Sequence, residues 1–368
     1  MTKAAELAAL IGAQTAQSNR NIVINGAMNI AQYSTSETGL GASSGYFTID
    51  RFRMVSSNTA GRFTMSQASV TDLPEFANAL KLDCTTADTS IAAAELLTIQ
   101  TKFEGNSLQR LQKGTSGARS VTVSFYMKTN KAFTFMCEFD DNDNNRFNGQ
   151  QFTTTTSWTR HSITFVGDTT GTLDDDNARS AQLNIHLHGG ANFTGGTYSA
   201  NTWQSRASSD ANRAVGIDSF FDSTDNEVQL TGLQMEVGEV ATPFEHLSAP
   251  QDLAKCQRYY YQVNYDTNVP YLGAGAVYRT TLAMLVMHLP VTMRAAPTAI
   301  TQSGTAAHYT SWGNEATQAC SAVPAIRAGD SKTSVNVDLT FNTLNSATGT
   351  YLYRIANTSG YLGVSAEL

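Results

Sequence analysis

The sequence predicts an all-β protein, in which an antiparallel jelly-roll sandwich is preceded by a short N-terminal helix and followed by a second, smaller β-domain. Three observations predict this class. Apolar side chains recur at every second residue in many segments, Thr, Ser, Asn and Gly are abundant throughout, and only seven prolines occur in 368 residues. At about 100–200 residues per domain, a chain of this length suggests two domains or three.

Residues 1–20 are predicted to contain the short amphipathic helix. Apolar side chains follow the spacing i, i+3, i+4, i+7 at Ala4, Leu7, Ala8 and Ile11, and Gly12 is placed to end the helix. A helix of about ten residues is marginal in water by itself, so its apolar stripe needs a partner. That partner is either the chain's own first domain or another protein molecule.

Residues 21–247 are predicted to form the jelly-roll domain. The clearest alternation places apolar side chains on one face at Val121/Val123/Phe125, Phe133/Phe135/Cys137/Phe139, Ile163/Phe165, Leu183/Ile185/Leu187 and Leu233/Met235/Val237. Turn-rich loops separate these segments, as in a two-sheet sandwich. Gly232 interrupts the alternation of the last strand and predicts a β-bulge there.

Residues 248–262 are predicted to form a helical connector, because Ser248 suits an N-cap and Pro250 suits the first turn. Four residues at its end are expected to wedge between the two domains: Cys256, Tyr259, Tyr260 and Tyr261. Residues 263–368 then form the second β-domain. Its segment 282–289 is apolar enough for both faces to be covered, and the chain is expected to end on a paired strand.

Four segments resemble a family of bacteriophage fibre and appendage proteins. They are NIVINGAMNI (21–30), FTIDRF (47–52), LQMEVGEVATPFE (233–245) and CQRYYY (256–261). The resemblance covers residues 1–262 and continues more weakly to VSAEL at 364–368. It implies a virion-binding N-terminal segment followed by a jelly roll similar to a carbohydrate-binding module.

The resemblance further implies a virion protein, assembled in the host bacterial cytoplasm, that attaches the particle to host-surface polysaccharide without catalysis. It favours a homotrimer. Contacts with other virion proteins or with its own copies are expected through Leu7, Leu10 and Ile11.

Composition argues against other partners. A net charge of −7 and a pI near 5.4 disfavour nucleic-acid binding, and no apolar stretch reaches the ~18 residues that would span a bilayer. The N-terminus lacks the pattern of a signal peptide, so folding in a cytoplasm is expected. The four widely spaced cysteines are expected to be reduced and buried.

Glycan binding needs an aromatic platform for a sugar ring and planar amides for its hydroxyls. Residues 197–210 offer both, because Trp203 is surrounded by Thr, Ser, Asn and Gly and no apolar period would bury it. The candidate contacts are Trp203, Tyr198, Asn201 and Gln204. Trp312 is a further aromatic candidate, whereas Trp158 precedes a predicted strand and is assigned to the core.

Two acidic turns are rich enough in oxygen to hold Ca²⁺: Asp140, Asp141 and Asp143 in the first, and residues 174–176 in the second. Both lack the spaced glycine and bidentate glutamate of an EF-hand. Solvated turns are therefore favoured and no cofactor is expected. Because jelly-roll carbohydrate modules often hold a structural calcium ion, calcium at the first turn stays open as an alternative.

His186 and His188 lie two residues apart on a predicted strand, so both rings face the side opposite its apolar residues. Two imidazoles on one face can bind a metal, but no third ligand is evident. An exposed polar face is the favoured interpretation.

Catalysis is not expected. Glycosidases use two carboxylates about 5–10 Å apart, and Glu236, Glu239 and Glu245 lie close in sequence. Glu236, however, belongs to the strand that closes the jelly roll, where a carboxylate usually ties down a loop. No nucleophile elbow, zinc-protease motif or phosphate loop occurs. The open alternatives are a tailspike-type polysaccharide hydrolase and a head or collar decoration protein without a receptor.

Overall fold

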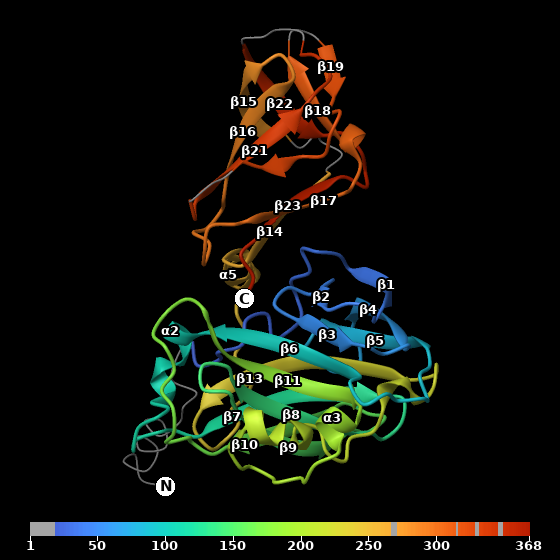
Figure 1. Cartoon of the computed structure of the whole chain (residues 1–368), viewed down its shortest axis with the longest axis vertical. Helices are drawn as coiled ribbons and strands as arrows, with labels where there is room; N and C mark the ends of the chain where they lie inside the picture. The colour runs from blue at the N-terminus through green and yellow to red at the C-terminus, as the bar shows by residue number, and fades with distance from the viewer. Residues whose placement is uncertain (1–18, 266–270, 314–315, 328–330, 345–348) are drawn as a thin grey trace. The chain divides into compact units, whose positions relative to one another are not determined.

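The computed structural model describes residues 19–265, 271–313, 316–327, 331–344 and 349–368. The chain divides into two compact units, which we call unit 1, ending at Asp252, and unit 2, from Leu253 to Glu367. Both consist of antiparallel sheets (Figure 1), so the predicted all-β class is confirmed. The predicted N-terminal helix, with Leu7, Leu10 and Ile11, lies outside the described residues. No helix in the described ranges has the length and hydrophobicity to cross a membrane.

Unit 1 contains two sheets. The six-stranded sheet has the order β1 (Ser36–Leu40), β4 (Arg62–Ser69), β5 (Asn78–Thr86), β13 (Glu227–Val237), β7 (Val121–Thr129) and β10 (Thr159–Phe165). The seven-stranded sheet has the order β12 (Gln204–Ser205), β9 (Arg146–Thr153), β8 (Thr134–Asp141), β11 (Arg179–Gly189), β6 (Leu96–Glu104), β3 (Arg53–Ser57) and β2 (Gly45–Tyr46). Every pairing between these strands is antiparallel, and most neighbours in the two sheets are strands that are not successive in the chain.

The core of unit 1 is formed by the apolar face of each predicted strand. Leu183, Ile185 and Leu187 on β11 are buried in the same cluster as Val123 and Phe125 on β7. The apolar residues of the alternation thus meet on one face of each sheet, although the other face of β11 is buried as well. The predicted strand positions are therefore confirmed for this unit.

Short helices lie between the strands. They are α2 (Gly105–Leu108), η2 (Gln109–Leu111), α3 (Ala191–Thr194), α4 (Arg206–Ser209), η3 (Asp210–Asn212) and η4 (Phe220–Asp222). Residues 190–222 connect β11 to β13 and include four of these helices and β12. Strand β12 pairs with β9, and Gln151 Nε2 donates to Val215 O at 2.7 Å. The connection therefore returns along the β9 edge of the seven-stranded sheet.

The predicted bulge in the last strand of unit 1 is confirmed. Gly232 has φ +62°, and the β13–β7 register shifts between Thr231 and Gln234. The shift frees Leu233 N, which donates to Gly26 O at 2.9 Å. A Cβ at Gly26 would lie 2.0 Å from Leu233 O, so glycine is required for this approach. The segments at 21–30 and 233–245 are thus bonded directly to each other through their backbones.

The segment at 47–52 joins the same structure. Asn25 Nδ2 donates to Asp50 O at 3.0 Å, and Asp50 Oδ1 accepts from Gln32 N at 2.7 Å. Arg51 Nη2 donates to Lys102 O on β6 at 2.7 Å. Residues 47–52 are therefore bonded both to the segment at 21–32 and to β6.

Unit 2 also has two sheets. The smaller has the order β14 (Tyr260–Asn264), β23 (Tyr361–Ser365) and β17 (Ala299–Gln302). The larger has the order β19 (Ala316–Ala319), β18 (Tyr309–Gly313), β22 (Gly349–Ile355), β15 (Tyr271–Arg279), β16 (Leu282–His288), β21 (Ser334–Thr340) and β20 (Ala325–Ile326). Helix α5 (Ala249–Gln257) spans the boundary residue Asp252, and η5 (Ala306–His308) precedes β18. The predicted terminal strand is confirmed as β23.

Two expectations for unit 2 need correction. The predicted connector 248–262 is helical only over α5, because Tyr260 begins β14 and pairs with Ser365 near the end of the chain. Strand β16 is covered on one face only: Leu285 is fully buried, whereas Val286 is 38% exposed. A run of apolar residues on a short strand does not reveal whether its second face is covered.

Candidate functional site

The face of the seven-stranded sheet opposite the core has three rows of side chains, most of them polar. Strands β3, β6, β11 and β8 are neighbours in register, so residues two apart on each strand fall in successive rows. The middle row aligns Arg53, Gln100, Asn184 and Glu138. The flanking rows align Val55, Thr98, His186 and Met136 on one side, and Lys102, Gln182 and Asp140 on the other.

The middle row is a continuous chain of hydrogen bonds. Gln100 Nε2 donates to Asn184 Oδ1 at 3.0 Å, and Asn184 Nδ2 donates to Glu138 Oε1 at 2.7 Å. Arg213, which follows η3, completes it with two bonds to Glu138, from Nη2 at 2.6 Å and from Nε at 2.8 Å. Such a paired contact fixes both planar groups in one orientation. The positions of these amides are therefore set by the sheet and by the 190–222 connection together.

A second carboxylate lies one row away. Gln182 Nε2 donates to Asp140 Oδ2 at 2.7 Å, and Arg213 Nη2 lies 3.3 Å from the same oxygen. Arg206 Nη2, at the start of α4, contacts Asp140 Oδ1. Asp140 is fully buried, and these three side chains surround it.

The two histidines are buried, which corrects the exposed polar face expected from the sequence. His186 Nδ1 lies 2.9 Å from Thr98 Oγ1, and His186 Nε2 lies 3.3 Å from Glu138 Oε2. His188 lies 2.8 Å from Ser219 Oγ and 3.0 Å from Glu95 Oε2. The alternation predicted their direction correctly, but not the residues that cover them.

The pKa values of Glu138 and Asp140 are shifted in opposite directions. Burial raises the pKa of Glu138, but the adjacent Arg213 guanidinium and His186 outweigh it and hold that pKa well below its usual value. Burial and the neighbouring Glu138 charge raise the pKa of Asp140, and Arg213 and Arg206 only partly offset them. Glu138 is therefore the firmly ionised member of the pair.

A pocket of about 120 Å³ opens on these rows. We call it the polar groove, and its lining residues are Val55, Leu96, Thr98, Gln100, Gln182, Asn184, His186, Arg206 and Arg213. Two buried atoms in it have no hydrogen-bond partner within the described protein: Gln182 Oε1 and Arg206 Nε. A buried polar atom without a partner is costly, so each favours a ligand or solvent molecule that supplies one.

The four predicted glycan contacts do not line this pocket. Trp203 is half-buried against the core, where its indole Nε1 donates to Val166 O at 2.8 Å. Its ring packs edge-on against Phe139 at 5.6 Å, and Lys113 Nζ lies 5.3 Å from the ring centre. The ring that was predicted to be a sugar platform is thus largely used by the fold.

The other three predicted contacts brace the 190–222 connection. Tyr198 Oη accepts from Gln151 N at 3.1 Å. Asn201 Oδ1 accepts from Val166 N at 3.0 Å, and Gln204 Oε1 accepts from the Asn212 side chain at 2.6 Å. Of the other tryptophans, Trp158 Nε1 donates to Asp72, and Trp312 in unit 2 is 44% exposed.

Sequence reasoning missed the residues that form the groove. The alternation on β6 and β11 correctly separates Gln100, Gln182 and Asn184 from the core face. A usable signal is that this polar face is rich in amides and histidines, whereas solvated strands usually present Lys and Glu. Arg206 and Arg213 had no signal, because their approach depends on how residues 190–222 fold back.

The acidic turn considered for calcium is held by cations and amides. Asp140 and Asp141 are consecutive on β8 and so face opposite sides of the sheet. Asp141 lies 2.5 Å from Lys113 Nζ, and Asp143 Oδ2 accepts from Asp174 N at 3.1 Å. In the part of the chain that the structure describes, no three His, Cys, Asp or Glu side chains form a metal-binding group.

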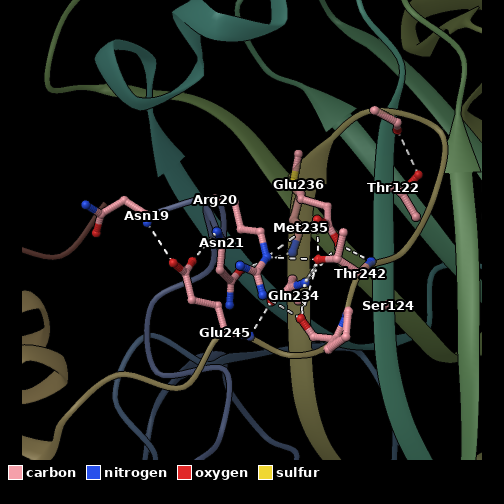
Figure 2. A network of polar contacts seen from close by, with 12 residues as sticks. Asn19, Arg20, Asn21, Thr122, Ser124, Gln234, Met235, Glu236, Thr242 and Glu245 are labelled. Atoms are coloured by element: carbon pink, nitrogen blue, oxygen red, sulfur yellow. Dashed lines mark hydrogen bonds and ion pairs between the residues drawn. The ribbon is translucent and has the colours of Figure 1, made fainter. Parts of the chain in front are cut away.

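Two of the three carboxylates considered for hydrolysis, Glu236 and Glu245, belong to a clasp that holds the N-terminal segment (Figure 2). Glu236 is buried, and its oxygens accept from Gln234 Nε2 at 2.8 Å, Thr242 N at 2.9 Å and Thr242 Oγ1 at 2.7 Å. Arg20 Nε lies 3.9 Å away. Glu245 accepts from the backbone N–H groups of Asn19 and Asn21 at 2.7 and 2.8 Å. Glu236 therefore ties down a loop, as the sequence suggested.

We expect Glu236→Gln to lower the free energy of unfolding of unit 1 by about 1–3 kcal/mol. The substitution replaces one acceptor oxygen by an amide NH₂ group, which would face N–H and O–H donors whose hydrogen bonds the carboxylate now accepts. Urea unfolding measures this loss. The matched control is Glu239→Gln at an exposed neighbouring position, where a change within about 0.5 kcal/mol is expected. Equal effects of the two substitutions would contradict the clasp.

All four cysteines are buried, as the sequence predicted. Burial raises the pKa of Cys84 to about 11 and that of Cys320 to about 12. These thiols therefore stay protonated near neutral pH, and thiol protonation disfavours nucleophilic chemistry.

No protein-family model matches this chain, and no curated protein matches it by sequence. Solved structures with similar folds include the enzymatically active domain of tailspike protein 4 of bacteriophage CBA120, at 9% identity and a TM-score of 0.31 over 59% of this chain. This chain spans only 21% of that tailspike chain.

Two carbohydrate-binding modules are also similar. One is a family 11 module from Clostridium thermocellum in complex with a β-1,3-1,4-mixed-linked tetrasaccharide, at 12% identity and a TM-score of 0.28, covering 57% of this chain and 99% of the module. The other is TmCBM61 in complex with β-1,4-galactotriose, at 10% identity and a TM-score of 0.26, covering 60% and 99%. No conclusion about a ligand follows from likeness at this level.

Proposed function

We propose that this chain is a non-enzymatic virion appendage protein of the tail-fibre type, which attaches the particle to host-surface glycans through the polar groove. The virion role is supported by the resemblance of four sequence segments to phage fibre and appendage proteins. The glycan role is supported by the groove itself.

The observation that carries the glycan proposal is the set of fixed, partly unpartnered polar atoms in an open pocket. Gln100 and Asn184 are oriented by hydrogen bonds across the sheet, and Gln182 Oε1 and Arg206 Nε have no partner among the residues that the structure describes. Sugar hydroxyls both donate and accept, so a saccharide can satisfy these atoms of either kind. A rigid sheet also removes much of the ordering cost of binding.

A glycan microarray of bacterial surface polysaccharides tests this proposal with the purified chain. We expect binding to a subset of the polysaccharides, and Gln182→Ala is expected to weaken it by about tenfold, the effect of losing one or two hydrogen bonds to the ligand. Gln251→Ala is the matched control, because this glutamine is exposed on α5 and does not line the groove.

Equal binding by the Gln182→Ala variant and the wild type would contradict a role for the groove. Binding to no polysaccharide would contradict the receptor role altogether. If virions that lack the protein also adsorbed at a normal rate, a head or collar decoration would become the better interpretation.

Self-association and virion docking complete the proposal. The apolar stripe at Leu7, Leu10 and Ile11 is proposed to bind other virion proteins or two further copies of the chain, giving a homotrimer. The protein would fold in the host bacterial cytoplasm and function on the virion. No metal or organic cofactor is part of the proposed activity.

One observation favours a second candidate, polysaccharide hydrolysis. Glu138 and Asp140 lie two apart on β8, and their pKa values are shifted in opposite directions, as in a pair of acid and base carboxylates. Against it, both carboxylates are fully buried, and Arg213 binds both. Release of reducing ends that is lost in Asp140→Asn would favour the hydrolase over the binding protein.

A further inference from the structure

We infer that the polar groove selects glycans that contain a carboxylate-bearing sugar, with Arg206 as the specificity-determining residue. This inference rests on the proposed glycan-binding function and adds the chemical class of the ligand. Uronic acids and other sugar acids belong to that class.

The ionisable side chains that line the groove are Arg206, Arg213 and His186, and none of the lining residues is acidic. This composition is the reverse of the chain as a whole, which has 31 Asp and Glu against 24 Lys and Arg. Glu138 and Asp140 lie among these cations but do not line the pocket. The surface presented to a ligand therefore consists of guanidinium and amide groups without a carboxylate, which favours a ligand that accepts hydrogen bonds from N–H donors.

The two arginines have different roles. Arg213 is committed to the protein, because it makes two bonds to Glu138 and further contacts with Asp140 at 3.3 Å and Asp210 at 3.4 Å. Arg206 contacts Asp140 through Nη2, whereas its buried Nε has no partner in the described protein. The Arg206 side chain is 25% exposed. Arg206 is thus the cation with capacity left for a ligand, and a guanidinium matches the geometry of a carboxylate.

Gln182 allows the groove to discriminate a sugar acid from a simple inorganic anion. Gln182 and Arg206 both bind Asp140, one at Oδ2 and the other at Oδ1, so they are neighbours in the groove. Gln182 is 6% exposed, and its Oε1 is an acceptor that has no partner in the described part of the chain. An anion such as phosphate or sulfate at neutral pH offers it mainly acceptors, whereas a sugar acid offers a carboxylate for Arg206 and a hydroxyl donor for Gln182.

The test uses matched pairs of polysaccharides that differ only in charge. Each uronic-acid-containing polysaccharide on the array is paired with its carboxyl-reduced form, in which the uronate has become the neutral hexose. We expect the acidic form to bind at least about tenfold more tightly, because hydrogen bonds to a charged group are roughly twice as strong as neutral ones. This preference should shrink as salt is raised.

Arg206→Gln keeps planar N–H donors and removes the charge. We expect it to reduce the preference, measured as the ratio of the affinities for the acidic and the reduced form, to about twofold or less, and Arg206→Lys to restore part of the preference. Arg119→Gln, at an exposed arginine that does not line the groove, should leave the preference unchanged. Circular dichroism of each variant checks folding, and the salt dependence of the wild type tests the claim without any substitution.

The outcomes separate this inference from the proposed function. Equal binding of acidic and reduced forms would overturn the acidic-sugar inference and leave glycan binding intact. Equal binding of a sulfated neutral glucan and the best uronate would overturn the assignment to a carboxylate. Binding to none of these polysaccharides would overturn both.

Discussion

Replacing Arg213 by methionine is expected to lower the free energy of unfolding of unit 1 by about 3–5 kcal/mol, because the substitution leaves a buried carboxylate without its cation. Glu138 is fully buried, and Arg213 supplies two of its hydrogen bonds, at 2.6 and 2.8 Å. Asp140 would lose a contact in the same substitution. Urea unfolding, followed by a probe in unit 1, measures the loss.

The pH dependence of this loss has a definite sign. The pKa of Glu138 is held below its ordinary value of 4.5 in the folded chain, so the stability that it contributes is present above pH 4.5 and is lost as the pH falls toward the folded value. The deficit of Arg213→Met should therefore be largest near neutral pH and should shrink on acidification below about pH 4.5.

Two further variants serve as controls for the stability loss expected in Arg213→Met. Adding Glu138→Gln to Arg213→Met removes the unpaired charge, so the double variant should regain part of the lost stability. Arg119→Met changes an exposed arginine and should alter stability by no more than about 0.5 kcal/mol. A loss below about 1 kcal/mol in Arg213→Met would show that the groove is not built on this ion pair.

Replacing Tyr260 by alanine is expected to destabilise unit 2 by about 3–5 kcal/mol, the usual cost of deleting a fully buried aromatic ring. Tyr260 is 1% exposed and begins β14, and a Cβ at Gly363 on β23 would lie 2.5 Å from its Oη. The hydroxyl also lies 2.8 Å from Thr301 Oγ1 on β17. One side chain therefore contacts all three strands of the smaller sheet.

Hydrogen exchange measures which strands are destabilised by Tyr260→Ala. Amides of β23 and β17 should lose protection in Tyr260→Ala, while amides of β11 in unit 1 keep theirs. Tyr260→Phe retains the ring and should cost only about 1 kcal/mol for the lost hydrogen bonds. Unchanged protection of β23 in Tyr260→Ala would show that the ring does not support this sheet, and the wedge between domains would become the better explanation of its burial.

The alternation of apolar residues was enough to predict the core of unit 1. Leu183, Ile185 and Leu187 are buried where the period of two places them, and Gly232 produces the bulge that it predicted. Local periodicity and glycine chemistry suffice for features of this kind. The contact between residues 21–30 and 233–245 was not predicted, and only the structure shows that Gly26 is required by its approach to Leu233.

The groove could not be predicted in the same way. An alternating strand looks alike whether its polar face is solvated or covered, so the burial of His186 and Gln182 was not visible in sequence. The surroundings of Trp203 could not be predicted either, because they depend on residues that are distant in sequence. Its neighbours are polar, but Phe139 and the Val166 carbonyl, distant in sequence, take up its ring edge and its N–H group.

The three consecutive tyrosines at 259–261 illustrate a third limit of prediction from the sequence. Cys256, Tyr259 and Tyr260 are buried as expected, but Tyr260 pairs with Ser365, more than a hundred residues away. Strand pairings at such separation leave no periodic sign in either segment, so the sequence placed these tyrosines on a connector and not in a sheet.

The location of a bound glycan tests the central claim most directly. The measurement is a crystal structure of the full chain soaked with the oligosaccharide derived from the tightest-binding polysaccharide of the array. We expect the saccharide on β6 and β11, with hydroxyl groups on Gln182 and Gln100 and its carboxylate on Arg206. A saccharide bound instead at Trp203 or Trp312, with the polar groove unoccupied at saturating ligand, would contradict the claim.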